Sequence, residues 1–281
     1  MWGWHGGGAV MGGPGAVVAA REEGAGRFIL NCEPSAGVEG DWTFEDALAA
    51  GVVSRAAARA EVDLRRPDWP VRDQGSTGAC VGFAAADGVL HWHYWKAGLL
   101  APGERPSPRF IWMANKETDR LNDYPTTFIE SAGTQTKLAL RVARRYGCVP
   151  DSVLPMDGAL SPMRAAAFYT MAARYRIASY HNLRRSRTAW RRWLSNQGPI
   201  LARVEVDRTF RQAAGTHGEL ALFRMDEDEP GGGHAICLVG YTANTFIVRN
   251  SWGADWGDNG FAYASEEYAD RAITEAYGAV M

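Results

Sequence analysis

Cysteine is scarce in this chain of 281 residues, and long apolar runs and an excess of one charge are missing altogether. The four cysteines, Cys32, Cys80, Cys148 and Cys237, include no CxxC pair and no short spacing to histidine, which argues against a disulfide framework or a zinc site. No stretch reaches 18 consecutive apolar residues, so we expect no membrane-spanning helix. Thirty basic against 32 acidic side chains leave a formal charge of −2, and this balance does not call for nucleic acid or an anionic membrane as a partner.

The first residues also lack the basic start and apolar block of a secretory signal. They read MWGWHGGGAVMGGPG. Together with the few isolated cysteines, this predicts a cytoplasmic protein. Hydrophobic residues, in contrast, make up 46% of the chain, which is enough for a large core in one large domain or two modest ones.

Composition changes near residue 26, inside an extension that precedes the main domain. Residues 1–26 hold nine glycines and little periodicity, which is typical of an irregular arm. RFILNC, at 27–32, is a strand candidate; FEDALAAG predicts a helix capped by Asp41 or Thr43, and a second short helix is expected from Ser54. We therefore predict an N-terminal extension at 1–60 and a main domain at 61–281.

Helical patterns fill the middle of the main domain, and short strands follow. Helices are predicted at about 80–97, 107–117, 134–146, 161–173 and 186–196. From Pro199 onward, the runs PILARVEV, HAICLVGYT, TFIVRNSW and GFAYAS are β-rich and are separated by Gly, Asn and Asp. Helices first and strands later predict an α+β protein of two lobes.

Cys80 stands at the start of the helix predicted at 80–97, directly after the polar turn DQGSTGA. The unpaired amides and the positive end of the helix dipole favour an anion there, so we expect the pKa of this thiol to fall and its reactive thiolate to become more populated. A cysteine that merely packs at this place is the competing interpretation. Packing is the expectation for the other three cysteines.

A base and an orienting group for such a thiol occur late in the chain. GGGHAICLVGY places His234 at the start of a buried strand, and FIVRNSWGADWGDNGF places Asn250 at the end of the next one. A cysteine nucleophile needs a histidine to take its proton, and the histidine needs a partner that holds its ring in one tautomer and plane. Asn250 has a side chain that can do this.

The segments DQGSTGAC, GGGHAICLVGY and RNSWGADWGDNGF together resemble the papain-like cysteine peptidases. His234 comes 154 positions after Cys80, near the roughly 130 to 150 positions known for this family. The resemblance covers residues 61–281. It implies a papain-like two-lobe fold, with a helical lobe followed by an antiparallel β-barrel-like lobe and the active-site cleft between them.

The same resemblance implies roles for individual residues. The catalytic set that it implies is Cys80, His234, Asn250 and Gln74. Cys80 is the nucleophile, and Gln74 donates to the oxyanion together with the Cys80 backbone amide. The substrate-binding positions are Gly133, Thr134, Ala235 and Trp252. Thr134 stands where many relatives have a second glycine, so its Cβ is expected to narrow the wall along which a substrate pairs its backbone.

Two departures from the family pattern lie beside the nucleophile. Thr77 occupies the place of a cysteine that secreted relatives use in a disulfide, and Val81 replaces the usual tryptophan. Neither change removes a catalytic group. His91 and His93 form an HxH pair, but on a regular helix they point about 200° apart and cannot share a metal. We expect no metal and no cofactor.

The predicted activity is hydrolysis of a peptide or protein substrate through a thioester. An acyltransferase or ligase that passes the acyl group to an amine or thiol is the alternative. A non-catalytic binding module is disfavoured by the intact catalytic set. The extension at 1–60 is expected to lie over or beside the cleft and to restrain activity; the competing interpretation is that RFILNC adds a permanent strand to the β lobe.

Overall fold

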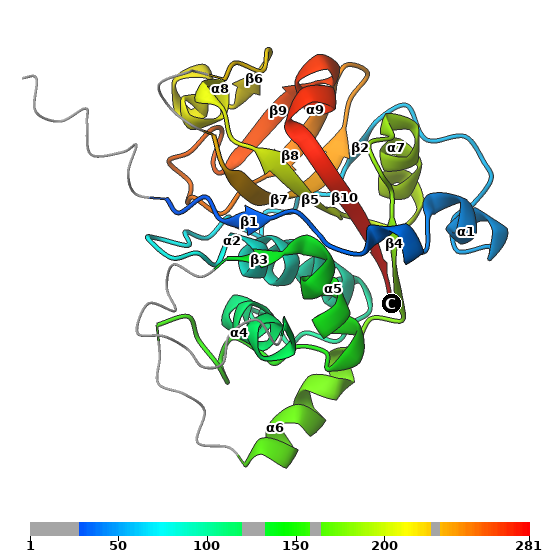
Figure 1. Ribbon diagram of the computed structural model, residues 1–281, viewed down its shortest axis with the longest axis vertical. Coiled ribbons are helices and arrows are strands. Elements are labelled where there is room, and N and C mark those ends of the chain that lie inside the picture. The colour runs from blue at the N-terminus through cyan, green and yellow to red at the C-terminus, as the bar shows by residue number, and fades with distance from the viewer. Residues whose placement is uncertain (1–27, 120–132, 158–163, 226–230) are drawn as a thin grey trace, which may run out of the picture.

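The computed structural model describes residues 28–119, 133–157, 164–225 and 231–281, so the glycine-rich arm predicted at 1–26 lies outside it. Two lobes lie one above the other in Figure 1, and the described part of the extension runs between them. The helical lobe contains α2 (Cys80–Gly82), η2 (Phe83–Leu90), α3 (His91–Lys96), α4 (Pro108–Asp119), α5 (Thr136–Arg145), α6 (Ala165–Ala172) and η4 (Ala173–Tyr175).

The second lobe is an eight-stranded sheet with the strand order β4-β10-β5-β7-β8-β9-β6, and β2 pairs with β7 beside this path. Its strands are β2 (Val62–Asp63), β4 (Ser179–Asn182), β5 (Ile200–Glu205), β6 (Glu219–Leu220), β7 (Gly233–Tyr241), β8 (Thr245–Arg249), β9 (Phe261–Ser265) and β10 (Ile273–Val280). All pairs are antiparallel except β6 with β9. The α+β prediction is confirmed, although the described strands form an open sheet and no closed barrel.

Helices α7 (Arg187–Asn196), α8 (Arg208–Arg211) and α9 (Glu266–Ala272) accompany the sheet. The helices predicted at 107–117, 134–146 and 186–196 are confirmed as α4, α5 and α7, and Pro108 occupies the first turn of α4. In the region predicted as a helix at 161–173, α6 begins at Ala165, and 158–163 lie outside the described residues. None of the helices in the described ranges is long and apolar enough to span a bilayer.

Residues 80–96 form one continuous helix with a π-helical middle, because the junctions at Phe83 and Leu90 keep helical backbone angles. Its residues are buried from Cys80 to Tyr94, as expected for a helix that is apolar on nearly all sides. Gly88 brings it close to the sheet: a Cβ there would lie 2.9 Å from the Cβ of Cys237 on β7. The helix that begins at Cys80 therefore runs directly against the strand that carries His234.

The extension contacts both lobes. Helix α1 (Phe44–Ala49) begins after a capping box made by Thr43 and Asp46, and Phe44 and Val53 are buried in the core of the β lobe. The other two elements expected in this part were predicted wrongly. No helix forms between Ser54 and residue 60, and RFILNC contributes only the start of the two-residue strand β1 (Cys32–Glu33).

Strand β1 does not join the eight-stranded sheet. It pairs in parallel with β3 (Thr134–Gln135), which leads into α5 of the helical lobe. Pro34 follows immediately and has no N–H to continue a ladder. The interpretation that RFILNC adds a strand to the β lobe is therefore wrong, and the segment instead crosses the space between the lobes.

Candidate active site

His234 and Asn250 meet through the pairing of neighbouring strands. His234 is the second residue of β7, and Asn250 directly follows β8, which pairs with β7. The Nε2 atom of His234 lies 2.7 Å from Oδ1 of Asn250. Because an amide oxygen only accepts, Nε2 carries the proton. The opposite ring atom, Nδ1, has no hydrogen-bond partner among the described residues.

Aromatic rings enclose this histidine–asparagine pair. The Trp252 ring lies 4.8 Å from the His234 ring, centre to centre, and Phe210 contacts both rings edge-on. His234 is fully buried, and burial lowers its pKa to about 4, against a smaller raising effect of its bond to Asn250. The imidazole is therefore neutral at pH 7. Trp256 is also buried and donates from Nε1 to the Phe210 carbonyl at 2.9 Å.

Cys80 begins the central helix, as predicted, and its thiol is fully buried. The backbone N–H groups of Ala235 and Val81 face the sulfur and lower the pKa of the thiol, but burial has the larger effect and raises that pKa to about 11. The predicted fall in the pKa of Cys80 is therefore wrong for this arrangement, because the free-energy cost of burying a thiolate exceeds the stabilisation that the helix N-terminus gives it. Cys80, like His234, is uncharged at pH 7.

Gln74 lies next to the segment that carries Asn250. Its backbone N–H donates to the Ser251 carbonyl at 2.8 Å, and its side-chain oxygen accepts from the Ser251 hydroxyl at 2.7 Å. The side-chain amide donates one of its two hydrogens to the Thr77 carbonyl at 2.8 Å. These contacts fix the amide plane and leave its second hydrogen for another acceptor.

The wall expected at Gly133 and Thr134 is already occupied by the extension. Asn31 passes so close to Gly133 that an added Cβ would lie 2.0 Å from the Asn31 carbonyl oxygen. Thr134 is the Cα partner of Cys32 in the pairing of β1 with β3. The Asn31 side-chain oxygen also reaches the sulfur of Cys80, at 4.0 Å. Residues 31 and 32 therefore cover the nucleophile and the wall together.

The glycines before His234 face the same segment from the opposite lobe. A Cβ on Gly232 would lie 2.7 Å from the Cβ of Leu30, and one on Gly233 would lie 2.0 Å from the carbonyl oxygen of Cys32. That oxygen accepts from Nε of Arg203 at 2.8 Å. The glycine run in GGGH thus provides room for the extension between the lobes.

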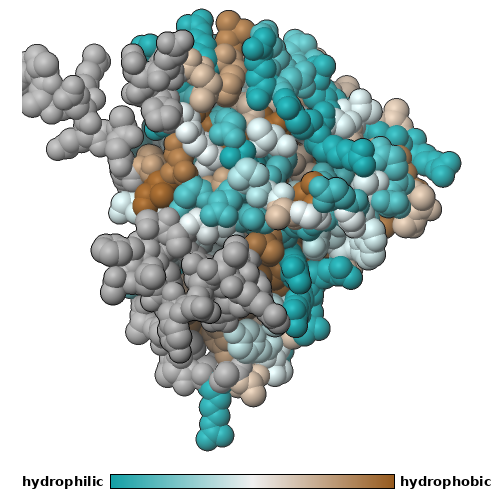
Figure 2. All heavy atoms as spheres, viewed as in Figure 1, coloured by the Kyte–Doolittle hydropathy of each residue, from teal (hydrophilic) through white to brown (hydrophobic). Residues whose placement is uncertain are grey.

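Side chains anchor both ends of the covering segment. Phe28 stacks on Trp252, with ring centres 4.3 Å apart and planes within 5°. Glu275 accepts from the Ser35 backbone N–H at 2.6 Å and from the Ser35 hydroxyl at 2.7 Å. Figure 2 shows hydrophobic atoms where the segment enters between the lobes. We call residues 28–36 the cleft segment.

The structure brings all eight predicted site residues to one region, where β7, the end of β8, the loop before α2 and strand β3 meet. Sequence reasoning missed Arg203 and Glu275, which hold the cleft segment. It had no local signal for them, because they are single charged residues in β-rich runs that become neighbours only through the pairing of β5 with β10. No group of three or more potential metal ligands occurs in the parts of the chain described above.

Comparisons with known proteins point to one family. A family model described as papain family cysteine protease matches residues 130–279. Mouse cathepsin J is 25% identical over 71% of this chain and 57% of its own length, so the match spans little more than half of that relative. Among solved structures, xylellain, a cysteine protease from Xylella fastidiosa, superposes with a TM-score of 0.73 at 20% identity over 91% of this chain and 97% of that one. Procathepsin B from Trypanosoma congolense superposes with a TM-score of 0.64 at 16% identity, over 90% of this chain and 86% of its own.

Proposed function

Because the chain belongs to the papain family of cysteine proteases, we propose that it hydrolyses peptide bonds with Cys80 as nucleophile, His234 as base and acid, and Asn250 as orienting group. The observation that carries this proposal is the 2.7 Å bond from His234 Nε2 to Asn250, which leaves Nδ1 as the nitrogen without a partner among the described residues. An imidazole held in this tautomer has its lone pair on Nδ1, ready to accept a proton. Ala235, the residue after His234, donates from its backbone N–H to the sulfur of Cys80.

The chemistry assigned to these groups follows in two steps. The Cys80 sulfur attacks the substrate carbonyl, its proton passes to Nδ1 of His234, and His234 returns that proton to the leaving amine. The oxyanion accepts from the Cys80 backbone amide and from the second amide hydrogen of Gln74, a type of donor whose loss costs about 3 kcal/mol of transition-state stabilisation. Water then attacks the thioester, and the acid is released.

We further propose that the cleft segment restrains the enzyme, so that only a small open fraction of the molecules turns substrate over. Two observations support this. The segment occupies the wall at Gly133 and Thr134, so a substrate cannot pair its backbone there. It also contacts the Cys80 sulfur through Asn31 and the glycines before His234. In this covered state the pKa values of Cys80 and His234, about 11 and about 4, disfavour the thiolate–imidazolium pair. When the segment moves, water reaches both groups, and the charged pair becomes less costly.

The test uses a set of fluorogenic peptides with the full chain and with Cys80→Ala, each with and without an added amine such as hydroxylamine. Mass spectrometry identifies the products. We expect peptide acids from the wild type and nothing from Cys80→Ala. Products that carry only the added amine would identify an acyltransferase instead. Absence of turnover and of a covalent Cys80 adduct from peptidyl electrophiles, both in the full chain and in Phe28→Ala, which loosens the cleft segment, would overturn both activities.

A further inference from the structure

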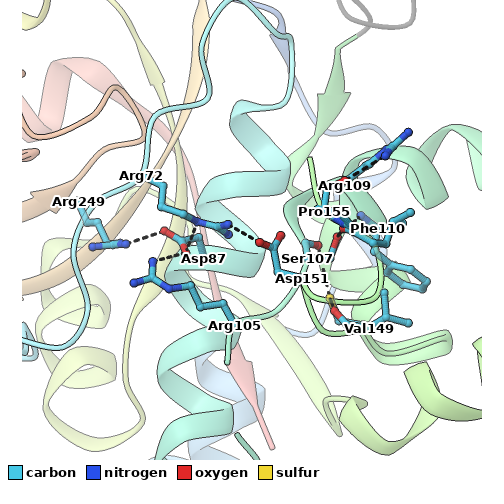
Figure 3. Close-up of polar contacts among 12 residues, drawn as sticks. Arg72, Asp87, Arg105, Ser107, Arg109, Phe110, Val149, Asp151, Pro155 and Arg249 are labelled. Carbon is cyan, nitrogen blue, oxygen red and sulfur yellow. Dashed lines mark hydrogen bonds and ion pairs between the residues drawn. The ribbon is translucent and has the colours of Figure 1, made fainter. Parts of the chain in front are cut away.

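Asp87 lies on the helix of Cys80, seven positions after it, and only 3% of it is exposed. Figure 3 shows three arginines that converge on its carboxylate from different elements. Arg249 donates to Oδ2 at 2.7 Å, Arg72 donates to Oδ1 at 2.9 Å, and Nη1 of Arg105 lies 3.5 Å from Oδ1. Burial alone would raise the pKa of Asp87, but Arg249, Arg72 and Arg105 together hold it below its ordinary value. The carboxylate is therefore ionised at neutral pH.

Arg249 joins this carboxylate to the triad. It is the last residue of β8 and directly precedes Asn250. Its guanidinium also donates to the carbonyls of Trp69 and Pro70, both at 2.9 Å. Three acceptors on one planar group leave it little rotational freedom. The position of Asn250 is therefore tied to Asp87 through one peptide unit and one rigid side chain.

Arg72 joins the same carboxylate to the oxyanion donor. It stands two positions before Gln74, and its other end donates to Asp151 at 2.9 Å. Gln74 in turn is bonded to Ser251, next to Asn250. Asp87, Arg72, Gln74, Ser251 and Arg249 therefore form a closed ring of bonds and chain neighbours. Because of this ring, the side-chain amides of Gln74 and Asn250 cannot shift independently of each other.

The strand of His234 meets the helix at the adjacent residue. Gly88 lets Cys237 of β7 pack closely, because a Cβ on residue 88 would lie only 2.9 Å from the Cβ of Cys237. Cys237 is three positions after His234 on the same strand. Helix, β7, β8 and the 69–74 segment thus meet at Asp87 and Gly88. Each of them carries one member of the catalytic set.

We propose that Asp87 is a positioning residue of the active site: by binding Arg249 and Arg72 together, it sets Asn250 and Gln74 relative to Cys80 on its own helix. The assignment rests on the proposed peptidase function. Asp87 contacts no reacting atom in this arrangement. Buried ion pairs often add little net stability compared with well-packed apolar groups, so the cluster is better explained by the geometry that it imposes than by the stability that it adds.

The experiment measures kcat and KM of the full chain on a cleaved peptide for Asp87→Asn, Arg249→Lys and the double variant. Arg249→Lys keeps the charge and removes the planar fork. We expect each single change to lower kcat by about 10- to 100-fold with KM within about threefold, because the lost interaction acts on catalytic geometry. The kcat of the double variant should be no lower than that of the more impaired single variant, because both changes break the same linkage.

Leu194→Ala is the matched control. Leu194 is buried in the core of the β lobe, on α7, and its truncation should lower the melting temperature while leaving kcat within about twofold of wild type. Two results would overturn the proposal. One is a folded Asp87→Asn or Arg249→Lys protein with wild-type kcat. The other is a double variant whose loss equals the product of the two single losses.

A second readout separates this inference from the proposed function. The rate of Cys80 alkylation by iodoacetamide, followed against pH by mass spectrometry, needs no substrate. We expect the variants to react more slowly at neutral pH and their pH profiles to shift upward, because His234 no longer stands in place to take the proton. If the wild type cleaves no peptide, the proposed function fails, and this profile still decides the role of Asp87; an unchanged profile would refute it. If Asp87→Asn does not fold, Arg249→Lys and Arg72→Lys take its place.

Discussion

Cys80 and Asp87 lie seven positions apart on one helix, both almost completely buried, and yet they differ in charge. Asp87 is ionised because three guanidinium groups surround it. Cys80 is neutral because its burial outweighs the lowering effect of the backbone N–H groups that face it and of Arg203, and His234 is itself neutral. Burial alone therefore does not determine whether a side chain is charged. The charged and polar groups that face the side chain determine it.

The difference also separates two uses of burial. At Asp87 the charges are permanent, and they hold elements of both lobes together. At Cys80 the cleft segment contacts the sulfur through Asn31, and if it is the movable cover that we propose, the charge state of the site changes when it moves.

Removal of the proton acceptor should have the largest effect. His234→Ala is expected to lower kcat by about a thousandfold or more, since the residues of a catalytic unit fail together. Asn250→Ala should cost less, about 10- to 100-fold, because it only orients the ring. Steady-state kinetics on one peptide give both values. An Asn250→Ala enzyme as inactive as His234→Ala would mean that Asn250 does more than orient the ring or that the fold is damaged.

Acid should destabilise the protein through its buried histidines. Burial lowers the pKa values of His91, His93 and His234 to about 4, whereas the unfolded chain binds these protons near pH 6.5. The free energy of unfolding therefore keeps its full value, as far as these histidines are concerned, above about pH 6.5. It falls as the pH drops toward 4, by up to about 4 kcal/mol per pH unit for three protons. Urea unfolding at several pH values measures the slope. His93→Phe should reduce it by about a third, and an unchanged slope would contradict the assignment.

Weakening the contacts of the cleft segment should raise activity without changing Cys80, His234, Asn250 or Gln74. Phe28→Ala removes the stack on Trp252, and Ser35→Ala removes the hydroxyl bonds to Glu275 and Thr136. Losses of about 1 to 3 kcal/mol should raise the open fraction about 5- to 150-fold. Peptide turnover and Cys80 alkylation should rise together.

The control for this pair of changes is Glu45→Ala, an exposed residue of α1 elsewhere in the extension, which should leave both rates unchanged. If turnover falls in Phe28→Ala while the melting temperature drops, the segment stabilises the fold and does not restrain activity. Deletion of the whole extension is the less decisive change, because Phe44 and Val53 belong to the core.

The smallest effect is expected at the wall. Thr134 is buried, and its hydroxyl has no hydrogen-bond partner in the described structure. Thr134→Gly should lower KM for peptides with bulky side chains about two- to fivefold and leave kcat unchanged, because it widens the groove without altering the triad. Thr134→Ser, which removes only the methyl group, should give an intermediate value. A fall in kcat would show that the wall also positions the reacting carbonyl.

The local elements were predictable from the sequence because their causes lie within a few residues. The central helix ends at Lys96, two residues before Gly98, whose φ of +67° suits glycine, and Thr43 caps α1. Strands β4 and β10 were missed, since neither alternates clearly or is flanked by turn residues, and pairing with β5 decides their state. The motifs around Cys80, His234 and Asn250 were likewise evident, because each is a short run of unusual composition.

By itself the sequence determined which groups are available for chemistry and which elements carry them. Only the tertiary structure decided that Asn31 lies over Cys80, that Arg203 and Glu275 hold the cleft segment, and that one aspartate gathers three arginines from distant parts of the chain. It also reversed the expected shift in the pKa of Cys80. The reason is physical: a helix dipole follows from local sequence, but burial and through-space charge depend on what the folded chain places around the group.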